Sequence, residues 1–117
     1  MPQDFDRPLA LSVAIDDRGS TRIVTARGEI DAGSAGLIAR ALRGAMSDRR
    51  FELVVLDLGE TTFIDTAGMA VVIDASQRAA ERALGFVVIR GPAVVQRVFD
   101  AYGFSELVPF VSDWAAA

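Results

Sequence analysis

Two acidic residues, Asp57 and Asp65, flank a short loop, and a hydroxyl residue, Thr66, follows the second of them directly. Paired carboxylates can act as general acid and base in hydrolysis, but neither a further acidic cluster nor a glycine-rich phosphate-binding loop accompanies this pair. Asp65-Thr66-Ala67-Gly68 has instead the composition of a helix start, with the aspartate as N-cap and Thr66 at an exposed first position. The Thr66 hydroxyl is therefore the group whose chemistry has to be explained.

Two interpretations of this hydroxyl remain open from the local residues alone. At a helix N-terminus, free backbone N–H groups and the positive end of the helix dipole would stabilise a phosphate on Thr66. Alternatively, Asp-Thr is simply a favourable helix start, and the hydroxyl has no functional role.

The residue types that the chain lacks exclude most catalytic chemistry. Its 117 residues include no Cys, no His and no Lys, so all 12 basic residues are Arg. These absences exclude disulfides, the usual Cys/His zinc sites, thiol and Ser-His-Asp catalysis, and the lysines of Walker A motifs and Schiff bases. We expect no catalytic residue, no metal and no cofactor, and predict that the protein is not an enzyme.

Length and charge favour one domain that binds another protein. With 51% hydrophobic residues, the chain suits a single domain, 1–117, with a core of about 9–111 and short flexible termini. No apolar run approaches the roughly 18 residues that span a bilayer. The net charge of -4 favours a basic partner surface over nucleic acid or an anionic membrane. We expect a soluble, cytoplasmic protein with no membrane insertion and no direct contact with nucleic acid.

Hydrophobic periodicity predicts alternating strands and helices. Strands are expected over 9–15, 21–26, 53–58, 86–89 and 107–110, and helices over 32–46, 66–84 and between Gly91 and Gly103. Asp31 is expected to cap the first helix, Gly28 to break the second strand and Gly85 to close the second helix, with 59–64 as a loop. This order implies an α/β fold whose mixed central sheet has an opening hairpin followed by parallel βαβ units, with helices packed on it.

Burial follows from the same pattern. We predict that two apolar strand segments, 54–56 and 87–89, are buried on both faces of the sheet. The polar side of the second helix is expected to be exposed at Asp74, Gln77, Arg78 and Glu81. The phenylalanines expected in the core are Phe51, Phe63, Phe86, Phe99 and Phe104.

Three separated segments resemble the STAS domains, the sulphate-transporter and anti-sigma-antagonist family. "LVVLDLGETTFIDTAGMAVVI" (53–73) is similar to the family's central motif, a strand ending Leu-Asp-Leu that leads into Asp-Ser/Thr-x-Gly at a helix start. "GEIDAGSA" (28–35) resembles the segment before the family's first helix, and "GPAVVQRVFDAYGF" (91–104) resembles its third-helix segment. The resemblance covers nearly the whole chain and implies a single STAS-like domain.

Stand-alone STAS domains of this size are mostly anti-sigma factor antagonists, also called anti-anti-sigma factors. The resemblance thus implies a bacterial signalling protein of transcription regulation, which binds an anti-sigma factor with ATP-dependent Ser/Thr kinase activity and so releases a sigma factor. It implies a phosphoprotein, with Thr66 as the residue that the kinase modifies to switch the protein off, and a phosphatase as a further candidate partner. The commonest motif is Asp-Ser-Ser/Thr-Gly, from which this chain departs at Thr66 and Ala67.

The predicted partner-binding residues lie on two neighbouring segments. Loops at the carboxyl ends of parallel strands usually carry function, and both "GEID" and "IDTAGM" are expected at such ends. Gly68 is expected to permit close approach of a partner or of the loop backbone. The predicted partner-binding set is Glu29, Asp31, Asp65, Thr66, Ala67, Gly68 and Met69.

Two other STAS roles remain as alternatives. Accessory STAS subunits of ABC-type lipid transport complexes often carry Asp-Thr-x-Gly, which "DTAG" matches. STAS scaffold modules of stress-signalling assemblies usually have a Thr acceptor. The segments "GEID" and "RVFDAYGF" favour the antagonist.

Overall fold

Strands and helices alternate along the chain in the predicted order, with one additional strand. The computed structural model describes residues 10–114, so Leu9 and the terminal stretches 1–8 and 115–117 lie outside the described residues. The strands are β1 (Leu11–Arg18), β2 (Thr21–Ile30), β3 (Leu53–Asp57), β4 (Thr61–Ile64), β5 (Gly85–Ile89) and β6 (Phe110–Val111). The helices are α2 (Ala35–Ser47), α3 (Thr66–Glu81) and α4 (Ala93–Ala101).

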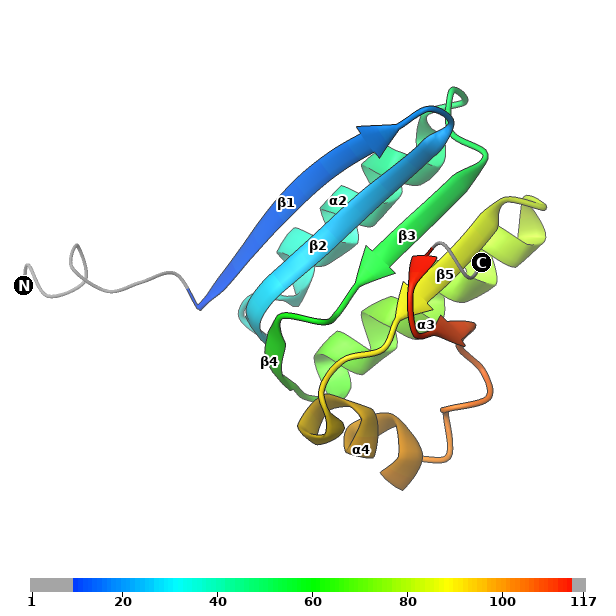
Figure 1. Cartoon of the computed structure of the whole chain (residues 1–117). Coiled ribbons are helices and arrows are strands. Elements are labelled where there is room, and N and C mark those ends of the chain that lie inside the picture. The colour runs from blue at the N-terminus through cyan, green and yellow to red at the C-terminus, as the bar shows by residue number, and fades with distance from the viewer. Residues whose placement is uncertain (1–9, 115–117) are drawn as a thin grey trace, which may run out of the picture.

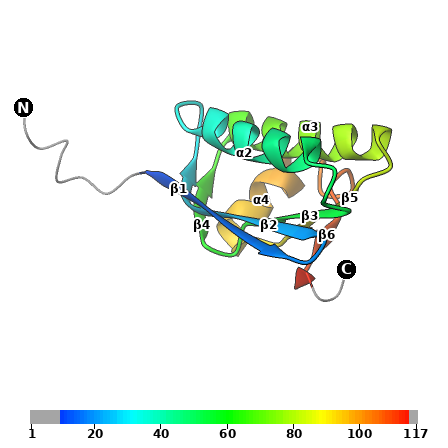
Figure 2. The same ribbon diagram turned by 90° about the horizontal axis from the view of Figure 1, so that it is seen from above.

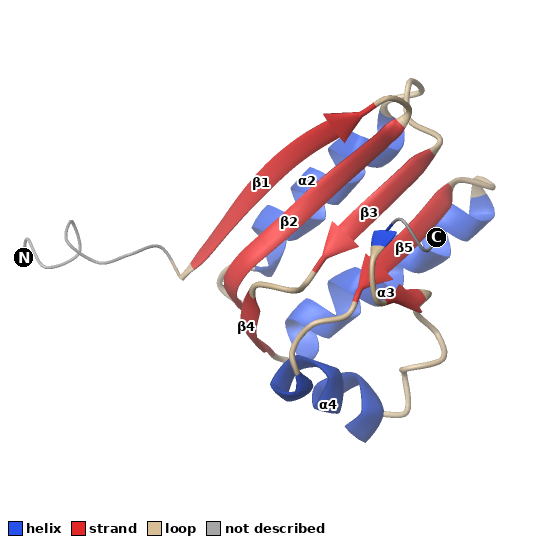
Figure 3. Ribbon diagram, in the orientation of Figure 1, coloured by secondary structure: helices blue, strands red, loops and turns tan. Residues whose placement is uncertain are grey.

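The strands form one mixed sheet (Figures 1 and 3). β1 and β2 make an antiparallel hairpin, and all the other strand pairs are parallel. The strand order is β1-β2-β3-β5-β6, with β4 paired to β2 off this path. The predicted fold class, an α/β domain with an opening hairpin followed by parallel βαβ units, is confirmed.

α2 and α3 lie side by side over one face of the sheet, as Figure 2 shows from above. Ile38 and Leu42 of α2 and Val72 of α3 are at most 1% exposed, and they join Val24 and Leu56 of the sheet in one core cluster. α4 packs against β4 and α3. Burial of these apolar faces sets the helices on the sheet, with the start of α3 at the end of β4.

The expected loop at 59–64 contains a strand, so that prediction was wrong. β4 pairs in parallel with the last residues of β2, where Ile30 lies opposite Ile64. The buried Thr61 hydroxyl donates a hydrogen bond to the Ala26 carbonyl at 2.9 Å and stabilises the pairing. A four-residue strand has too short a pattern to be recognised without its partner strand.

Gly28 does not break β2, which continues to Ile30. Its φ of 106° is rare for other residues, and a Cβ there would overlap the Ala10 carbonyl oxygen. The register between β2 and β4 shifts between Gly28 and Glu29. The glycine therefore marks a bulge that lets β2 pair with β1 on one side and β4 on the other.

Asp31 is not the N-cap of α2, because the helix begins at Ala35 and Ser34 occupies the cap position. The Asp31 carboxylate instead accepts hydrogen bonds from the N–H groups of Gly33 and Ser34, both at 3.0 Å, in the turn before the helix. Aspartate side chains stabilise such turns as readily as helix starts, so composition alone did not separate the two.

α3 ends at Glu81, and Gly85 is the first residue of β5 rather than the residue that closes the helix. Ala83 takes the left-handed position with a φ of 54°. The Leu84 N–H donates to the Ala79 carbonyl at 2.9 Å, as in the Schellman motif that normally has glycine at this position.

Burial agrees with most of the predicted pattern. The whole segment 54–56 is unexposed, but in 87–89 only Val88 is fully buried. Val87 and Ile89 are half-buried because they point away from the face that α2 and α3 cover. The polar residues predicted to be exposed on α3 are exposed: Asp74, Gln77, Arg78 and Glu81. Of the expected core phenylalanines, those buried or packed on the core are Phe51, Phe86, Phe99 and Phe104.

The left-handed Ala83 leads to a stability prediction. Ala83→Gly should raise the free energy of unfolding by about 0.5–1 kcal/mol, because glycine adopts this φ without the Cβ clash that alanine suffers. The matched change Ala80→Gly, at an exposed helical position of α3, should lower it by about 1 kcal/mol. Urea denaturation of both variants measures the two shifts, and equal destabilisation of both would contradict the prediction.

Candidate functional site

Asp65 caps α3, as predicted, and leaves Thr66 as the first helical residue. The Asp65 Oδ1 atom accepts hydrogen bonds from the N–H groups of Ala67 at 2.9 Å and Gly68 at 3.1 Å. Thr66 is exposed, and within residues 10–114 its side chain forms no hydrogen bond. Its hydroxyl is therefore open to a second molecule.

Parallel pairing of β2 and β4 brings the two predicted segments together. The Asp65 N–H donates to the Ile30 carbonyl at 3.1 Å, so the cap of α3 adjoins the end of β2. Glu29 and Asp31 flank Ile30 in that same strand end. The Ser34 hydroxyl donates to the Glu29 carbonyl at 2.8 Å and ties the turn before α2 to β2. Glu29, Asp31, Asp65 and Thr66 thus share one edge of the sheet.

Gly68 and Met69 lie beneath this edge rather than on it. Met69 is only 4% exposed, and a Cβ on Gly68 would lie 2.7 Å from Ile64 Cγ1 and 2.8 Å from the Ile30 carbonyl oxygen. Ala67 is half-buried against the core. These residues support the exposed ones from below. Contact of the predicted residues with a partner stays a prediction.

Phe63 was expected in the core, but it is 45% exposed. It lies opposite Glu29 in the ladder between β4 and β2, and the next residue, Ile64, turns inward. Val94 at the start of α4 and Leu37 in the first turn of α2 are also exposed, at 50% and 39%. Burial along β4 does not alternate, since Thr61 and Ile64 are buried while Thr62 and Phe63 between them are exposed, so a period-2 pattern could not have placed Phe63 at the surface.

The polar part of the site is acidic. Within the described part of the chain, Glu29, Asp31 and Asp65 form no ion pair, whereas Glu60 beside them pairs with Arg27 at 3.0 Å. Three carboxylates without an ion-pair partner therefore lie at the sheet edge that also carries Thr66. Such a rim suits a partner that presents basic side chains.

The site offers one hydroxyl group and no group placed to activate it. The chain has no His, Cys or Lys, and among residues 10–114 no three acidic side chains come close enough to hold a metal ion. The Asp65 carboxylate is engaged by two backbone N–H groups. This arrangement can present a hydroxyl to another protein's chemistry.

The family model of the STAS domain matches residues 12–117, nearly the whole chain. The chain belongs to the STAS domain family. The resemblance found in the three sequence segments is thereby confirmed. In this STAS domain, the family's Asp-Ser/Thr-x-Gly motif corresponds to the α3 cap and the exposed Thr66.

Solved structures of anti-sigma factor antagonists share the fold of this STAS domain. A crystal structure of an anti-sigma factor antagonist from Mycobacterium paratuberculosis is 20% identical over 91% of this chain and 89% of its own, with a TM-score of 0.78. The antagonist SpoIIAA in its unphosphorylated form is 15% identical over 90% and 92%, with a TM-score of 0.73. The Bacillus cell fate determinant SpoIIAA in its phosphorylated form is 14% identical over 90% and 96%, with a TM-score of 0.68.

None of the helices in residues 10–114 is long and apolar enough to cross a bilayer.

The contacts at Gly68 predict a destabilised variant. Gly68→Ala should lower the free energy of unfolding by about 1–3 kcal/mol, because the new methyl would overlap Ile64 and the Ile30 carbonyl. Gly44→Ala in α2, where a Cβ has no neighbour within 4 Å, should instead raise it by about 0.5–1 kcal/mol. Denaturant titration separates the two, and a Gly68→Ala variant as stable as wild type would refute the packing argument.

Proposed function

We propose that this STAS domain is an anti-sigma factor antagonist. It binds an anti-sigma factor that is also an ATP-dependent Ser/Thr kinase, and this binding releases a sigma factor. The domain is switched off when that kinase phosphorylates Thr66. The observation that carries the proposal is the exposed, unbonded Thr66 hydroxyl directly after the Asp65 cap of α3. Family membership and the shared fold with antagonist structures support it. The role places the protein in the bacterial cytoplasm.

The domain is then a substrate and a ligand rather than an enzyme. The kinase brings ATP, Mg²⁺ and the residue that orients or deprotonates the attacking hydroxyl. A site that has a hydroxyl but no general base is consistent with a kinase that supplies every catalytic group. A phosphatase would reverse the modification.

The Asp65 carboxylate determines how a phosphate would act. The sequence suggests free N–H groups to receive the phosphate, but Asp65 already occupies those of Ala67 and Gly68. A phosphate on Thr66 would add a charge of about -1.5 to -2 next to Asp65, at a sheet edge that also carries Glu29 and Asp31. The helix dipole still favours an anion here, so the fold survives. A partner cleft sized for a hydroxyl would have to accommodate and desolvate this larger dianion, and binding is lost.

The proposed partner surface combines the acidic rim with exposed apolar side chains. Phe63 on β4 lies opposite Glu29 of the rim, and β4 contacts α4, whose first turn carries Val94. Large exposed aromatic side chains often supply much of the binding energy at interfaces. We expect Phe63 to enter an apolar pocket of the anti-sigma factor while its basic residues face the carboxylates.

Substitution of Thr66 tests the switch. Thr66→Ala should fold, bind the anti-sigma kinase as tightly as wild type and resist labelling by ATP. Thr66→Glu should fold but bind at least about tenfold more weakly, because a carboxylate must be desolvated where a hydroxyl fitted. Isothermal calorimetry measures binding, and circular dichroism checks the fold.

Thr62→Ala is the matched control, because Thr62 is an exposed hydroxyl residue in the neighbouring strand β4. It should retain both binding and labelling. Labelling of wild type at Thr62 or Ser76 and never at Thr66, or unchanged affinity of Thr66→Glu, would show that the switch is elsewhere.

Substitution of Phe63 tests the partner surface separately. Phe63→Ser should weaken binding of the anti-sigma factor by about 1–3 kcal/mol without altering the free energy of unfolding by more than about 0.5 kcal/mol. Ile15→Ser is the control, since Ile15 is 47% exposed on β1 and lies opposite Val24, five residues along β2 from the Glu29 that faces Phe63. If calorimetry gave the two variants equal affinity for the anti-sigma factor, Phe63 would not be part of the interface.

One alternative role has a specific feature in its favour, the form Asp-Thr-x-Gly that "DTAG" shares with accessory subunits of ABC-type lipid transport complexes. A pull-down from the native cell distinguishes the two. Capture of an anti-sigma factor with an ATP-dependent kinase domain supports the antagonist, whereas capture of a permease and an ATP-binding cassette supports the transport role. A large stress-signalling assembly would indicate the scaffold module.

A further inference from the structure

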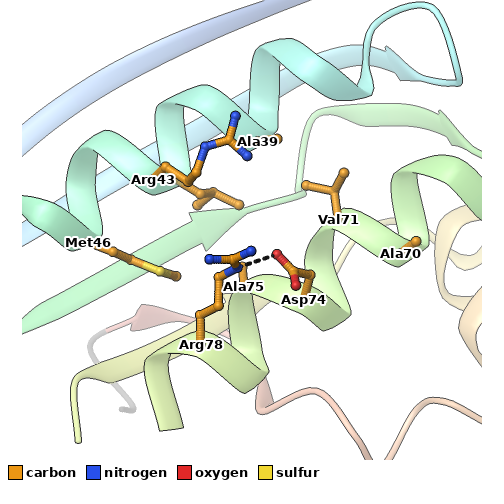
Figure 4. Close-up of a pocket in the computed structure, with 9 residues that line it drawn as sticks. Ala39, Arg43, Met46, Ala70, Val71, Asp74, Ala75 and Arg78 are labelled. Carbon is orange, nitrogen blue, oxygen red and sulfur yellow. Dashed lines mark hydrogen bonds and ion pairs between the residues drawn. The ribbon is translucent and has the colours of Figure 1, made fainter. Parts of the chain in front are cut away.

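A groove between α2 and α3 is separate from the surface around Thr66 (Figure 4). Its volume is about 230 Å³, and apolar atoms form most of its lining. The lining residues are Ala39, Leu42, Arg43 and Met46 of α2 and Ala70, Val71, Asp74, Ala75 and Arg78 of α3. The space exists because alanines stand where larger side chains would close the seam between two neighbouring helices.

The charges at this groove do not balance. Arg43 on α2 and Arg78 on α3 border it from opposite helices (Figure 4). The Arg78 guanidinium pairs with Asp74 through an Nε to Oδ2 distance of 2.7 Å. Within residues 10–114, the Arg43 guanidinium forms no ion pair or hydrogen bond. One positive charge therefore remains beside an apolar trough, in a chain whose net charge is -4.

An apolar trough with one uncompensated guanidinium complements an amphiphile that carries one negative charge. The groove extends from Ala39 to Met46 on α2 and from Ala70 to Arg78 on α3. At 1.5 Å per residue these spans are about 10–12 Å, the length of an extended alkyl chain of about eight carbons. A phosphate dianion fits less well, because within the described residues only one guanidinium at the groove is unpaired.

We propose that the α2–α3 groove binds a free medium-chain fatty acid, with its carboxylate at Arg43 and its alkyl chain along Leu42, Met46 and Val71. The Arg78–Asp74 pair borders the opposite side and stays intact. This site is independent of the proposed role of Thr66. Ala70, a lining residue of the groove, nevertheless lies one helical turn after Thr66 on α3.

The test uses the purified chain and sodium octanoate, with the side-chain methyl resonances of the protein as reporters. Octanoate should shift the methyl signals of Leu42, Met46 and Val71 with a dissociation constant on the order of 1 mM. The exposed methyl groups of Leu107, which does not line the groove, should not shift. Hexanoate should bind roughly tenfold more weakly, since each buried methylene contributes to affinity.

The contribution of charge to binding is tested by reversing the charge of residue 43 and, separately, that of the ligand. Arg43→Glu should weaken octanoate binding at least about tenfold, whereas Arg40→Glu, an exposed arginine of the same helix outside the groove, should change it less than about twofold. Octylammonium should not bind wild type at the same concentrations. Circular dichroism confirms that both variants fold.

Three results would overturn the proposal. The first is that octanoate leaves the groove methyl signals unshifted at about ten times the expected dissociation constant. The second is that Leu107 shifts as much as the groove residues, which means unspecific binding. The third is that octylammonium binds as well as octanoate and Arg43→Glu has no effect, which means that the groove accepts alkyl chains of any charge. None of these results bears on Thr66, so the proposed function stands or fails separately.

Discussion

The close approach of α3 to the end of β2 is the constraint on which the site depends. Gly68 leaves room for the Ile30 carbonyl, and the Asp65 N–H donates to that same carbonyl. With the first turn of α3 placed so near the strand, Met69 enters the core while Thr66 emerges at the surface. A methyl group at position 68 would push the helix start outward and change the depth and direction of the Thr66 hydroxyl.

Charge then distinguishes two surface regions that adjoin α3. Around its N-terminus the carboxylates of Glu29, Asp31 and Asp65 have no cationic partner within the described residues. Farther along the same helix, the α2–α3 groove has one uncompensated positive charge at Arg43. A basic protein surface and a small anionic amphiphile therefore suit different regions, both of which adjoin α3. Because the two regions are only about one turn apart at Ala70, occupants of both would be neighbours.

Local signals predicted much of this structure. The apolar runs of β3 and β5, the helical period of α2 and α3, and the Asp65 cap each depend on residues a few positions apart, so the sequence contains the whole signal. The acidic and hydroxyl members of the site were found for the same reason, since they follow predicted strands. β4 and the exposure of Phe63 were missed because a four-residue strand exists only through its pairing with β2.

The sequence by itself determined the α/β class, the family motif and the absence of His, Cys and Lys chemistry, because composition and short-range periodicity are sufficient for each. Tertiary structure decided that Gly28 forms a bulge instead of a strand end, and that Ala83 rather than Gly85 takes the left-handed position after α3. It also decided that small side chains on two helices leave a groove beside Arg43. The bulge, the pairing of Gly85 with Leu53 and the groove each depend on a contact between segments far apart in the chain, and only packing determines which segments meet.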